Sequence, residues 1–337
     1  YCLRQIGIDA NFVVGADILQ LGGSSGAGDS DIFVVEACEY DRSFHNFKPT
    51  IACILNIERD HLDCYKDEEE IIESFCQFAR GVRPEGLIVA GGDDPNIREM
   101  LNRLGPRVSS AGALRDTTTA TFGLDPECDF SARNLREVDG LYHFDVCQNG
   151  RRLGPARISL PGLHNVRNAM AVIAMAVSAG VEPDRLLDVG ESGCSPLEGF
   201  QGMDRRIMLK GQYDGISVLD DYAHHPTEIQ ASLKAIRQRY QPRRLWCVFQ
   251  AHQYSRTHAL LEEFANSFAQ ADKVILPEIY FARDSQASCD AVNAEILADR
   301  IRRSGTDAEH IATFDAVCDH LEQHVSAGDV VVTMGAG

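Results

Sequence analysis

The stretch ISVLDDYAHHPTEIQASLKAIRQRY, residues 216–240, decides the fold class of this chain. Its apolar start predicts a strand, and a polar loop follows. Pro226 suits the first turn of a helix, because its missing N–H would have no partner there. Beyond it, Ile229, Leu233 and Ile236 recur at the spacing of one helix face. The stretch therefore predicts a strand, a loop and a helix, the repeating unit of an α/β fold.

Short apolar strands and amphipathic helices alternate along most of the chain, so we predict an α/β fold with largely parallel sheets. Between residues 120 and 161 the pattern changes to antiparallel hairpins. The Gly- and Pro-containing stretch 191–202 predicts a domain boundary. The length of 337 residues favours two domains, which we place at residues 1–198 and 199–337.

The predicted elements continue this alternation on both sides of the boundary. The glycine-rich stretch LGGSSGAGDSD, residues 21–31, predicts a flexible turn between two strands rather than a phosphate loop, because its carboxylates would repel a phosphate. We expect strands at residues 31–37, 49–57, 86–92, 205–211, 216–223, 243–250, 272–280 and 329–335. We expect helices at residues 67–82, 94–104, 164–179, 226–240, 255–270 and 291–304.

The overall charge restricts the partners. Asp and Glu number 50 against 32 Lys and Arg, a net charge of −18, which argues against nucleic acid or an anionic membrane as the main partner. No apolar run approaches the length of a membrane span. The 11 cysteines show no Cys-x-x-Cys pair, and this pattern favours a reducing cytoplasm.

Two acidic loops in the first domain are candidates for a metal site. Glu36 follows the strand in VVEACEYDRSF, residues 34–44, and His61 lies in NIERDHLD, residues 56–63. If their strands are neighbours, the two side chains face one another at the carboxyl ends, where ligands bind in open α/β sheets. Carboxylates there commonly hold Mg²⁺, although histidine is an uncommon ligand for this ion. A solvated acidic loop is the alternative for the first stretch.

Two amides stand at the start of the predicted helix 164–179. Asn165 and Asn168 are three residues apart and share one face. Asn165 fits a helix cap, and two parallel amides also fit the edge of an adenine. Both interpretations stay open on these residues alone.

Two loops in the second domain are rich in polar side chains. DDYAHHPTE, residues 220–228, contains Asp221 and His224; its nearly contiguous polar residues argue against a metal hydrolase and favour contacts to a ribose and a substrate. FQAHQYSRT, residues 249–257, contains His252 and Arg256. An exposed helix start is one interpretation, and an anchor for a carboxylate or phosphate is the other.

Together and in this order, DDYAHHPTEI and FQAHQYSRT resemble signatures of the Mur ligases of peptidoglycan precursor synthesis, in particular the branch that adds L-alanine to UDP-N-acetylmuramate. The resemblance covers the whole chain. It implies a central ATP-binding domain with an antiparallel insertion and a C-terminal Rossmann-like domain that closes onto it. It also implies an ATP-dependent carboxylate–amine ligase that forms an acyl phosphate, which the amino group of L-alanine then attacks.

The resemblance also implies roles for residues. Glu36 and His61 become ligands of Mg²⁺, which accompanies ATP. Asn165 and Asn168 would contact adenine, Arg206 the ATP phosphates, and Asp221 the ribose. The catalytic candidates are Arg206, His224 and Arg256, and the residues facing the UDP-sugar acid and the incoming amino acid are Tyr222, His224, His252 and Arg256.

The chain departs from the family pattern in several places. The family's GTxGKT/S phosphate loop and the domain that holds UDP are absent, so we expect this segment to bind ATP poorly and to be incompetent alone. Gln253 stands where the alanine branch often has Arg, and residues 38–40, Cys-Glu-Tyr, replace Asp-Glu-Ser. Two alternatives stay open: a ligase that recycles a whole tripeptide onto the same sugar acid, and a non-catalytic binding remnant of a ligase.

Overall fold

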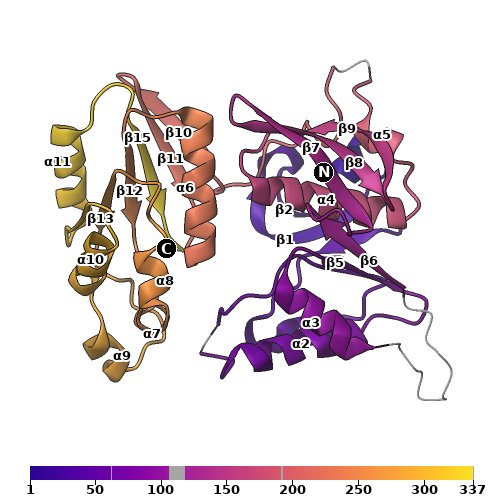
Figure 1. The fold of residues 1–337 in the computed structure, drawn as a ribbon, viewed down its shortest axis with the longest axis horizontal. Helices are drawn as coiled ribbons and strands as arrows, with labels where there is room; N and C mark the ends of the chain where they lie inside the picture. The colour runs from indigo at the N-terminus through magenta and orange to yellow at the C-terminus, as the bar shows by residue number, and fades with distance from the viewer. Residues whose placement is uncertain (62, 106–117, 191–192, 337) are drawn as a thin grey trace. The chain divides into compact units, whose positions relative to one another are not determined.

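The computed structural model of the chain describes residues 1–61, 63–105, 118–190 and 193–336 (Figure 1). Contacts between residues divide the chain into two compact units, Tyr1–Gly202 and Met203–Gly337. They are named the N-terminal unit and the C-terminal unit. Each has its own sheets and its own core.

A six-stranded sheet in the order β4-β5-β6-β7-β8-β9 forms the centre of the N-terminal unit. The antiparallel part is the meander from β7 to β9. The sequence places β6 in the antiparallel region as well, but β6 pairs in parallel with both β5 and β7. Helix α3 lies between β5 and β6, the kind of connection that parallel neighbours need. The strands are β4 (Ile51–Ile54), β5 (Leu87–Gly91), β6 (Thr118–Gly123), β7 (Phe130–Val138), β8 (Leu141–Gln148) and β9 (Arg151–Arg157).

Helices cover both faces of this sheet. Ile88 and Ala90 of β5 pack in the same cluster as residues of α2 and α3, whereas Val89 packs in the cluster that contains α4. A strand buried on both faces is apolar throughout, and for this reason residues 86–92 form a continuous hydrophobic run. The helices of this unit are α1 (Cys2–Gln5), α2 (Glu68–Arg80), α3 (Pro95–Leu104), α4 (Leu163–Ser178) and α5 (Asp184–Leu187), with 3-10 turns η1 (Leu19–Leu21) and η2 (Tyr40–Asn46).

Side-chain caps set where α2 and α3 begin. The carboxylate of Asp67 accepts a hydrogen bond from the amide of Glu70, and that of Asp94 accepts one from Ile97. Each satisfies an amide that the first helical turn leaves without a partner. The prediction of helices at 67–82 and 94–104 is confirmed.

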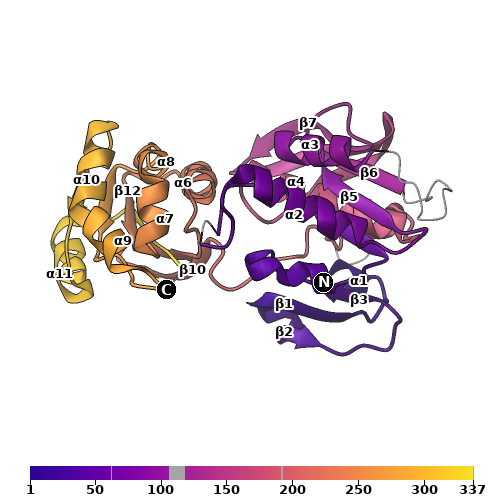
Figure 2. The same cartoon turned by 90° about the horizontal axis from the view of Figure 1, so that it is seen from below.

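A second, three-stranded sheet in the order β2-β1-β3 lies apart from the first within this unit (Figure 2). Its strands are β1 (Asn11–Ile18), β2 (Gly23–Gly26) and β3 (Phe33–Val35). The prediction of a flexible turn at 21–31 is therefore wrong in part, because Gly23–Gly26 pairs antiparallel with β1. The expectation that the strands before Glu36 and His61 are neighbours is also wrong: β3 bonds to β1, whereas β4 bonds to β5.

The C-terminal unit contains one six-stranded sheet in the order β10-β11-β15-β12-β13-β14. All its pairings are parallel except β10 with β11. The strands are β10 (Met208–Tyr213), β11 (Ile216–Asp221), β12 (Leu245–Phe249), β13 (Lys273–Leu276), β14 (Ala308–His310) and β15 (Val330–Met334). The helices are α6 (Pro226–Tyr240), α7 (Tyr254–Ala259), α8 (Leu261–Ala265), α9 (Gln286–Ala291), α10 (Ala294–Arg303) and α11 (Phe314–His324).

The central strand β12 is buried on both faces. Trp246 and Val248 pack in a cluster with Val317 of α11. Phe249, which belongs to the alternate set together with the buried Cys247, packs against the ring of Phe264 in α8. Figure 1 shows α11 and α6 on opposite sides of this sheet. The layering is that of a three-layer α/β unit.

Helix α6 begins and ends where the sequence predicts, but other elements of this unit differ. The predicted helix 255–270 is two helices, α7 and α8, because Leu260 (φ −114°, ψ 25°) leaves helical geometry between them. The elements α9, β14 and α11 are additional. The signal for α11 was present in the sequence, since Thr313 caps it by accepting a hydrogen bond from the amide of Ala316.

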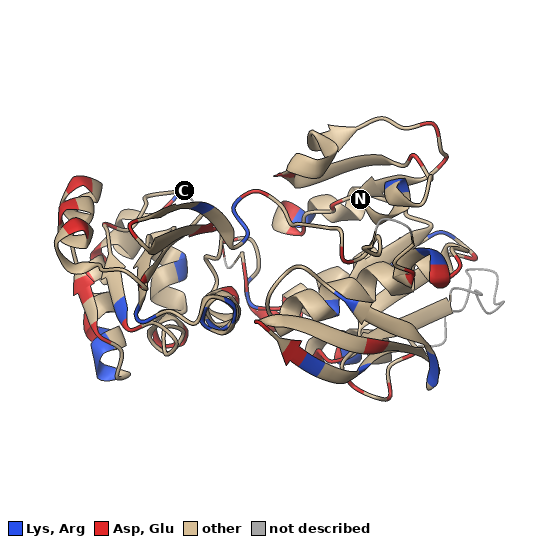
Figure 3. Cartoon of the chain, turned by 90° about the horizontal axis from the view of Figure 1, so that it is seen from above, with Lys and Arg blue, Asp and Glu red and all other residues tan. Residues whose placement is uncertain are grey.

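Acidic and basic side chains are spread over both units (Figure 3). Among the described residues, no helix is both long enough and apolar enough to cross a membrane.

Met170 of α4 tests the core of the N-terminal unit, where it is fully buried. Met170→Ala should lower the free energy of unfolding by about 2–5 kcal/mol, because the removed side chain leaves a cavity. Val172→Ala on the same helix is the matched control, since Val172 is 39% exposed and should change stability by about 0.5 kcal/mol or less. Urea-induced unfolding measures both. Equal losses in the two variants would contradict the placement of Met170.

Candidate functional site

Most of the candidate residues in the C-terminal unit lie at the carboxyl ends of parallel strands. Strands β11, β12 and β13 end at Asp221, Phe249 and Leu276, and their ends meet at one edge of the sheet. Ligands of open α/β sheets bind at this edge. The loops that leave it are residues 222–225, 250–253 and 277–285.

Asp221 has a buried carboxylate that is bonded within the protein. Its Oδ1 accepts a hydrogen bond from the amide of Ala223 (2.6 Å), and its Oδ2 accepts from the amide of Ile207 (3.0 Å) and the hydroxyl of Ser232 (3.1 Å). The side chain is 2% exposed. Burial raises the pKa of Asp221, and these donors act in the opposite sense. The predicted contact with a ribose would have to use those lone pairs of the Asp221 oxygens that the three donors leave unoccupied.

The segment before β10 is held in an unusual backbone conformation. Arg205 and Ile207 have φ values of 57° and 50°, which for a β-branched residue such as Ile207 is a true outlier. Asp221 binds the amide of Ile207, and the amide of Tyr222 donates to the carbonyl of Arg205 (2.7 Å). Arg206 lies between the two strained residues, with its guanidinium 5.5 Å from the centre of the Tyr222 ring.

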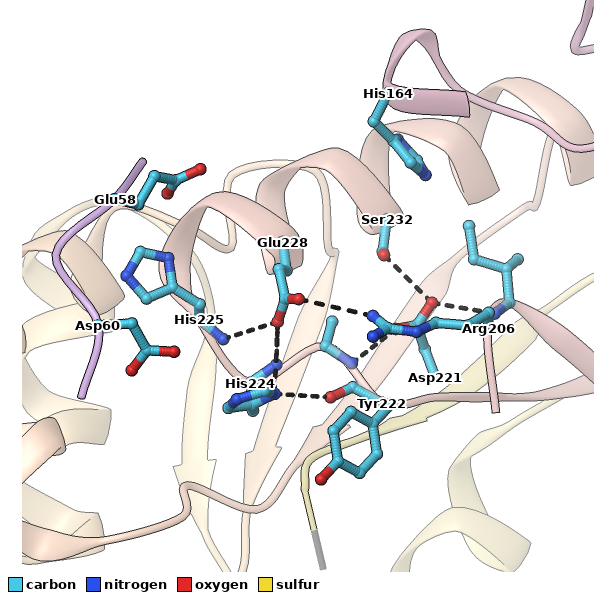
Figure 4. A network of polar contacts seen from close by, with 12 residues as sticks. Glu58, Asp60, His164, Arg206, Asp221, Tyr222, His224, His225, Glu228 and Ser232 are labelled. Carbon is cyan, nitrogen blue, oxygen red and sulfur yellow. Dashed lines mark hydrogen bonds and ion pairs between the residues drawn. The ribbon is translucent and has the colours of Figure 1, made fainter. Parts of the chain in front are cut away.

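Glu228 organises the loop that contains the two histidines (Figure 4). Its Oε2 accepts hydrogen bonds from the amides of His224 (3.0 Å) and His225 (3.2 Å), and its Oε1 lies 3.5 Å from Nη1 of Arg206. Burial alone would raise the pKa of Glu228, but the His224 ring, its amide and Arg206 hold that pKa below the ordinary value. The carboxylate therefore stays ionised and fixes Arg206 beside the loop.

The tautomer of His224 follows from its partner. Its Nδ1 lies 3.0 Å from the carbonyl oxygen of Tyr222. Because a carbonyl oxygen only accepts, Nδ1 carries the proton and the other ring nitrogen, Nε2, is the acceptor in the neutral ring. The Tyr222 ring packs edge-on against His224, with centroids 5.2 Å apart.

His252 stands in a cationic environment at the end of β12. Its ring stacks on that of Tyr280, with centroids 5.3 Å apart and planes at 14°. Burial lowers the pKa of His252, and the nearby positive charge of Arg256, with further contributions from His224 and Arg283, lowers it again. This cluster of basic groups in an acidic chain is suited to a carboxylate or phosphate.

Arg256 lies on α7 and is 9% exposed. The residue before α7, Gln253, has φ 77° and ψ 119° and is itself buried. His252 therefore lies in the loop after β12, and Arg256 lies in the helix that follows the turn at Gln253.

The two amides of the N-terminal unit lie at the start of α4. The cap of this helix is Gly162, so the interpretation of Asn165 as the cap residue is wrong. Its side-chain amide instead donates to the carbonyl of Pro161 (2.8 Å), and Asn168 lies 3.4 Å from the oxygen of Asn165. Asn168 is exposed. The adenine contact stays a prediction for both.

The metal candidates have separate partners. Oε2 of Glu36 accepts a hydrogen bond from the amide of Gly15 (2.6 Å), whereas Nε2 of His61 lies 3.1 Å from Oε1 of Glu39 and 3.9 Å from Oδ2 of Asp60. A Cβ at Gly15 would stand 3.2 Å from both oxygens of Glu36, so the glycine makes room for this carboxylate. His61 has φ 52°.

The acidic side chains of the stretch 34–44 suit Mg²⁺ in part. Carboxylate oxygens such as those of Glu36 and Glu39 are the ligands that Mg²⁺ prefers. The contact with His61 holds the pKa of Glu39 below its ordinary value, against the effect of burial, so Glu39 is an anion at neutral pH. Within the described residues, no group of three or more His, Cys, Asp or Glu side chains is arranged to hold a metal. The assignment of Glu36 and His61 stays a prediction.

Sequence reasoning gave no role to three residues that shape these sites: Glu228, Tyr280 and Asp284. The signal for Tyr280 and Asp284 was present, because residues 277–285 follow the apolar strand β13 as the other two loops follow theirs. Glu228 was also visible, three residues after the N-cap position His225, where a carboxylate closes a capping box.

Comparison with known proteins gives a consistent result. Residues 24–176 match the Mur ligase middle domain, and residues 205–337 match the domain described as Mur ligase, glutamate ligase domain. A UDP-N-acetylmuramate–L-alanine ligase of Alkaliphilus metalliredigens is 40% identical over 331 residues, which cover 98% of this chain and 67% of that protein.

Solved structures agree in fold. The UDP-N-acetylmuramate-alanine ligase MurC of Thermotoga maritima matches with a TM-score of 0.74 at 24% identity, covering 100% of this chain and 67% of that one. A murein peptide ligase of Psychrobacter arcticus matches with a TM-score of 0.65 at 25% identity, covering 100% and 70%.

The pKa of His252 tests whether this histidine is buried beside the positive charge of Arg256. Followed by NMR, His252 should titrate below the ordinary value of about 6.5, because burial and then Arg256 disfavour its charged form. The stability associated with neutral His252 is therefore fully present above the ordinary pKa of the unfolded chain. It is lost as the pH falls from that value through the lower pKa of the folded protein. Arg256→Gln should raise the midpoint part of the way, since burial remains.

Arg303→Gln is the control for this titration. Arg303 pairs with Asp299 on the surface of α10, so its loss should leave the His252 midpoint in place. A midpoint at or above the ordinary value in the unaltered protein would contradict the arrangement.

Proposed function

Because this chain belongs to the Mur ligase family, we propose that it forms the ATP-binding and C-terminal domains of a ligase that joins L-alanine to UDP-N-acetylmuramate in peptidoglycan synthesis. The observation that carries the proposal is the 40% identity to an L-alanine ligase over 98% of this chain. The basic cluster around His252 and Arg256 supports it, because both the sugar acid and the amino acid bring carboxylates.

The proposed reaction forms and breaks two bonds in sequence. The carboxylate of UDP-N-acetylmuramate attacks the γ-phosphate of ATP, which gives an acyl phosphate and releases ADP. The amino group of L-alanine then attacks the acyl carbon, forms the amide and releases phosphate. Such chemistry depends on positioning and charge neutralisation more than on covalent catalysis.

Several residues of the C-terminal unit have proposed roles in these steps. Arg206 binds the phosphates of ATP, and Asp221 contacts the ribose. Tyr222 and Arg256 face the carboxylates of the two substrates together with His252. His224, whose Nδ1 is committed to the Tyr222 carbonyl, presents Nε2 to accept a proton from the ammonium group of L-alanine.

In the N-terminal unit, Asn165 and Asn168 bind adenine, and Glu36 and His61 hold Mg²⁺. When bound, Mg²⁺ would neutralise charge on the phosphates. The carboxylate of Glu36 is oriented by the Gly15 amide, and the His61 ring is oriented by Glu39. All 11 cysteines are free thiols, which supports a cytoplasmic location.

Substrate-dependent release of phosphate tests the function. The natural polypeptide that contains this sequence should release phosphate from ATP only when both UDP-N-acetylmuramate and L-alanine are present. Release with a tripeptide but not with L-alanine would support the recycling ligase. No release with either acceptor would support a non-catalytic remnant and overturn the proposal.

His61→Ala tests the proposed magnesium site. We expect the Mg²⁺-dependent turnover of ATP to be abolished, because the variant loses a proposed ligand and leaves Glu39 without its partner at 3.1 Å. His143→Ala, in strand β8 of the meander, is the control and should retain turnover. Unchanged turnover in His61→Ala would rule out the magnesium assignment.

A further inference from the structure

Two loops of the C-terminal unit are bonded to each other along their backbones. Residues 250–253 leave β12, and residues 277–285 leave β13. The amide of Tyr280 donates to the carbonyl of Ala251 (2.9 Å), and the amide of Gln253 donates to the carbonyl of Tyr280 (3.0 Å). The two strands are neighbours in the sheet, so these bonds extend their parallel pairing beyond the sheet edge. The second loop therefore supports the first, which contains His252.

The supported loop adopts a backbone conformation that needs such support. Gln253 has φ 77° and ψ 119°, a region that costs a non-glycine residue about 1–3 kcal/mol. Its carbonyl accepts hydrogen bonds from the amide (3.1 Å) and the hydroxyl (2.8 Å) of Thr257, one turn further along α7. The turn at Gln253 thus sets the direction in which α7 leaves the sheet, and with it the position of Arg256.

Asp284 joins the supporting loop to the start of α7. Its Oδ2 accepts hydrogen bonds from the amides of Tyr254 (3.0 Å) and Ala282 (3.3 Å), and its Oδ1 accepts from both the amide (2.9 Å) and the hydroxyl (3.0 Å) of Ser255. The first amides of a helix have no partner within the helix. Asp284 supplies acceptors for the amides of Tyr254 and Ser255 from a distant part of the sequence. An N-cap residue normally supplies such an acceptor from the position just before the helix.

The charge state of Asp284 favours this role. Burial alone would raise the pKa of Asp284, but the hydrogen bonds from Ser255, Tyr254 and Ala282 hold it below the ordinary value. The side chain is therefore a carboxylate at neutral pH, and bonds to a charged acceptor are stronger than those between neutral groups. Its negative charge also lies within electrostatic range of His252.

We propose that Asp284 is a positioning residue of the ligase reaction. It holds the start of α7 so that His252 and Arg256 meet the carboxylates of UDP-N-acetylmuramate and L-alanine. This inference rests on the proposed function. Asp284 itself touches no reacting atom in this scheme. It acts through the four donors that it binds, three at the start of α7 and one in the loop 277–285.

The test uses three variants of the natural polypeptide. Asp284→Ala removes all four bonds. Asp284→Asn keeps one acceptor oxygen and should rescue part of the effect. Asp290→Ala is the matched control, because Asp290 is a carboxylate on the adjacent helix α9 that accepts its hydrogen bond from the side-chain amide of Gln286, one turn away (3.0 Å).

Kinetics give the first readout. Asp284→Ala should raise KM for L-alanine or for UDP-N-acetylmuramate by about tenfold or more, as loss of a charge-assisted hydrogen bond predicts, while KM for ATP stays within about twofold. Asp284→Asn should fall between, and Asp290→Ala should match the unaltered enzyme. A merely structural role would lower the active fraction, and so kcat, and leave every KM unchanged.

Amide hydrogen exchange gives a second readout that needs no substrate. The amides of Tyr254 and Ser255 should exchange about tenfold faster or more in Asp284→Ala, because each loses its acceptor. Faster exchange together with the KM change supports the proposal. Unchanged exchange, or faster exchange with every KM unchanged, overturns it. Absence of ligase activity in the unaltered enzyme would instead refute the proposed function and remove the basis for this role.

Discussion

The buried carboxylate of Asp221 is the interaction on which the C-terminal unit depends. It ties together the segment before β10, the loop after β11 and helix α6 through Ile207, Ala223 and Ser232. Without it, the buried amide of Ala223 and the partly buried amide of Ile207 would lose their acceptor, and an unpaired buried amide costs about 1–3 kcal/mol. The strained turn at Ile207 would also lose the bond that opposes its relaxation. The position of Arg206, which lies inside that turn, therefore depends on Asp221 as well as on its ion pair with Glu228.

Carboxylates that accept hydrogen bonds from backbone amides recur at this edge of the sheet. Asp221, Glu228 and Asp284 each direct their oxygens toward backbone amides of neighbouring loops. Backbone amides take up most of the hydrogen-bonding capacity of these carboxylates, so they offset the basic side chains of the loops only in part, as where Oε1 of Glu228 faces Arg206. This explains how a chain with a net charge of −18 can form a basic site. The acidic residues near the site mainly bind backbone amides, and the residues proposed to meet the substrates are mostly basic or aromatic.

The α/β fold could be predicted because strands buried on both faces, such as β5, are apolar without interruption. Strand pairing could not: β3 and β4 follow each other along the chain, yet they belong to different sheets, because pairing depends on contacts that no local pattern encodes. The same holds for the site. His224 and His252 stand in loops that the pattern marks, whereas the link from Asp284 to Tyr254 spans 30 residues of sequence. Left-handed backbone at Ile207 is likewise invisible in a residue that normally favours strands.

The depth of strand β12 has a consequence for thiol chemistry. Cys247 lies in the middle of this strand between β13 and β15, and burial raises the pKa of its thiol far above the ordinary value, so it stays protonated and inaccessible. Cys318, on the outer helix α11 of the same unit, is exposed. An alkylating reagent will therefore modify Cys318 in the native unit, and it will modify Cys247 only in molecules in which the sheet has unfolded. The unit contains its own pair of reporters, one for its surface and one for the opening of its core.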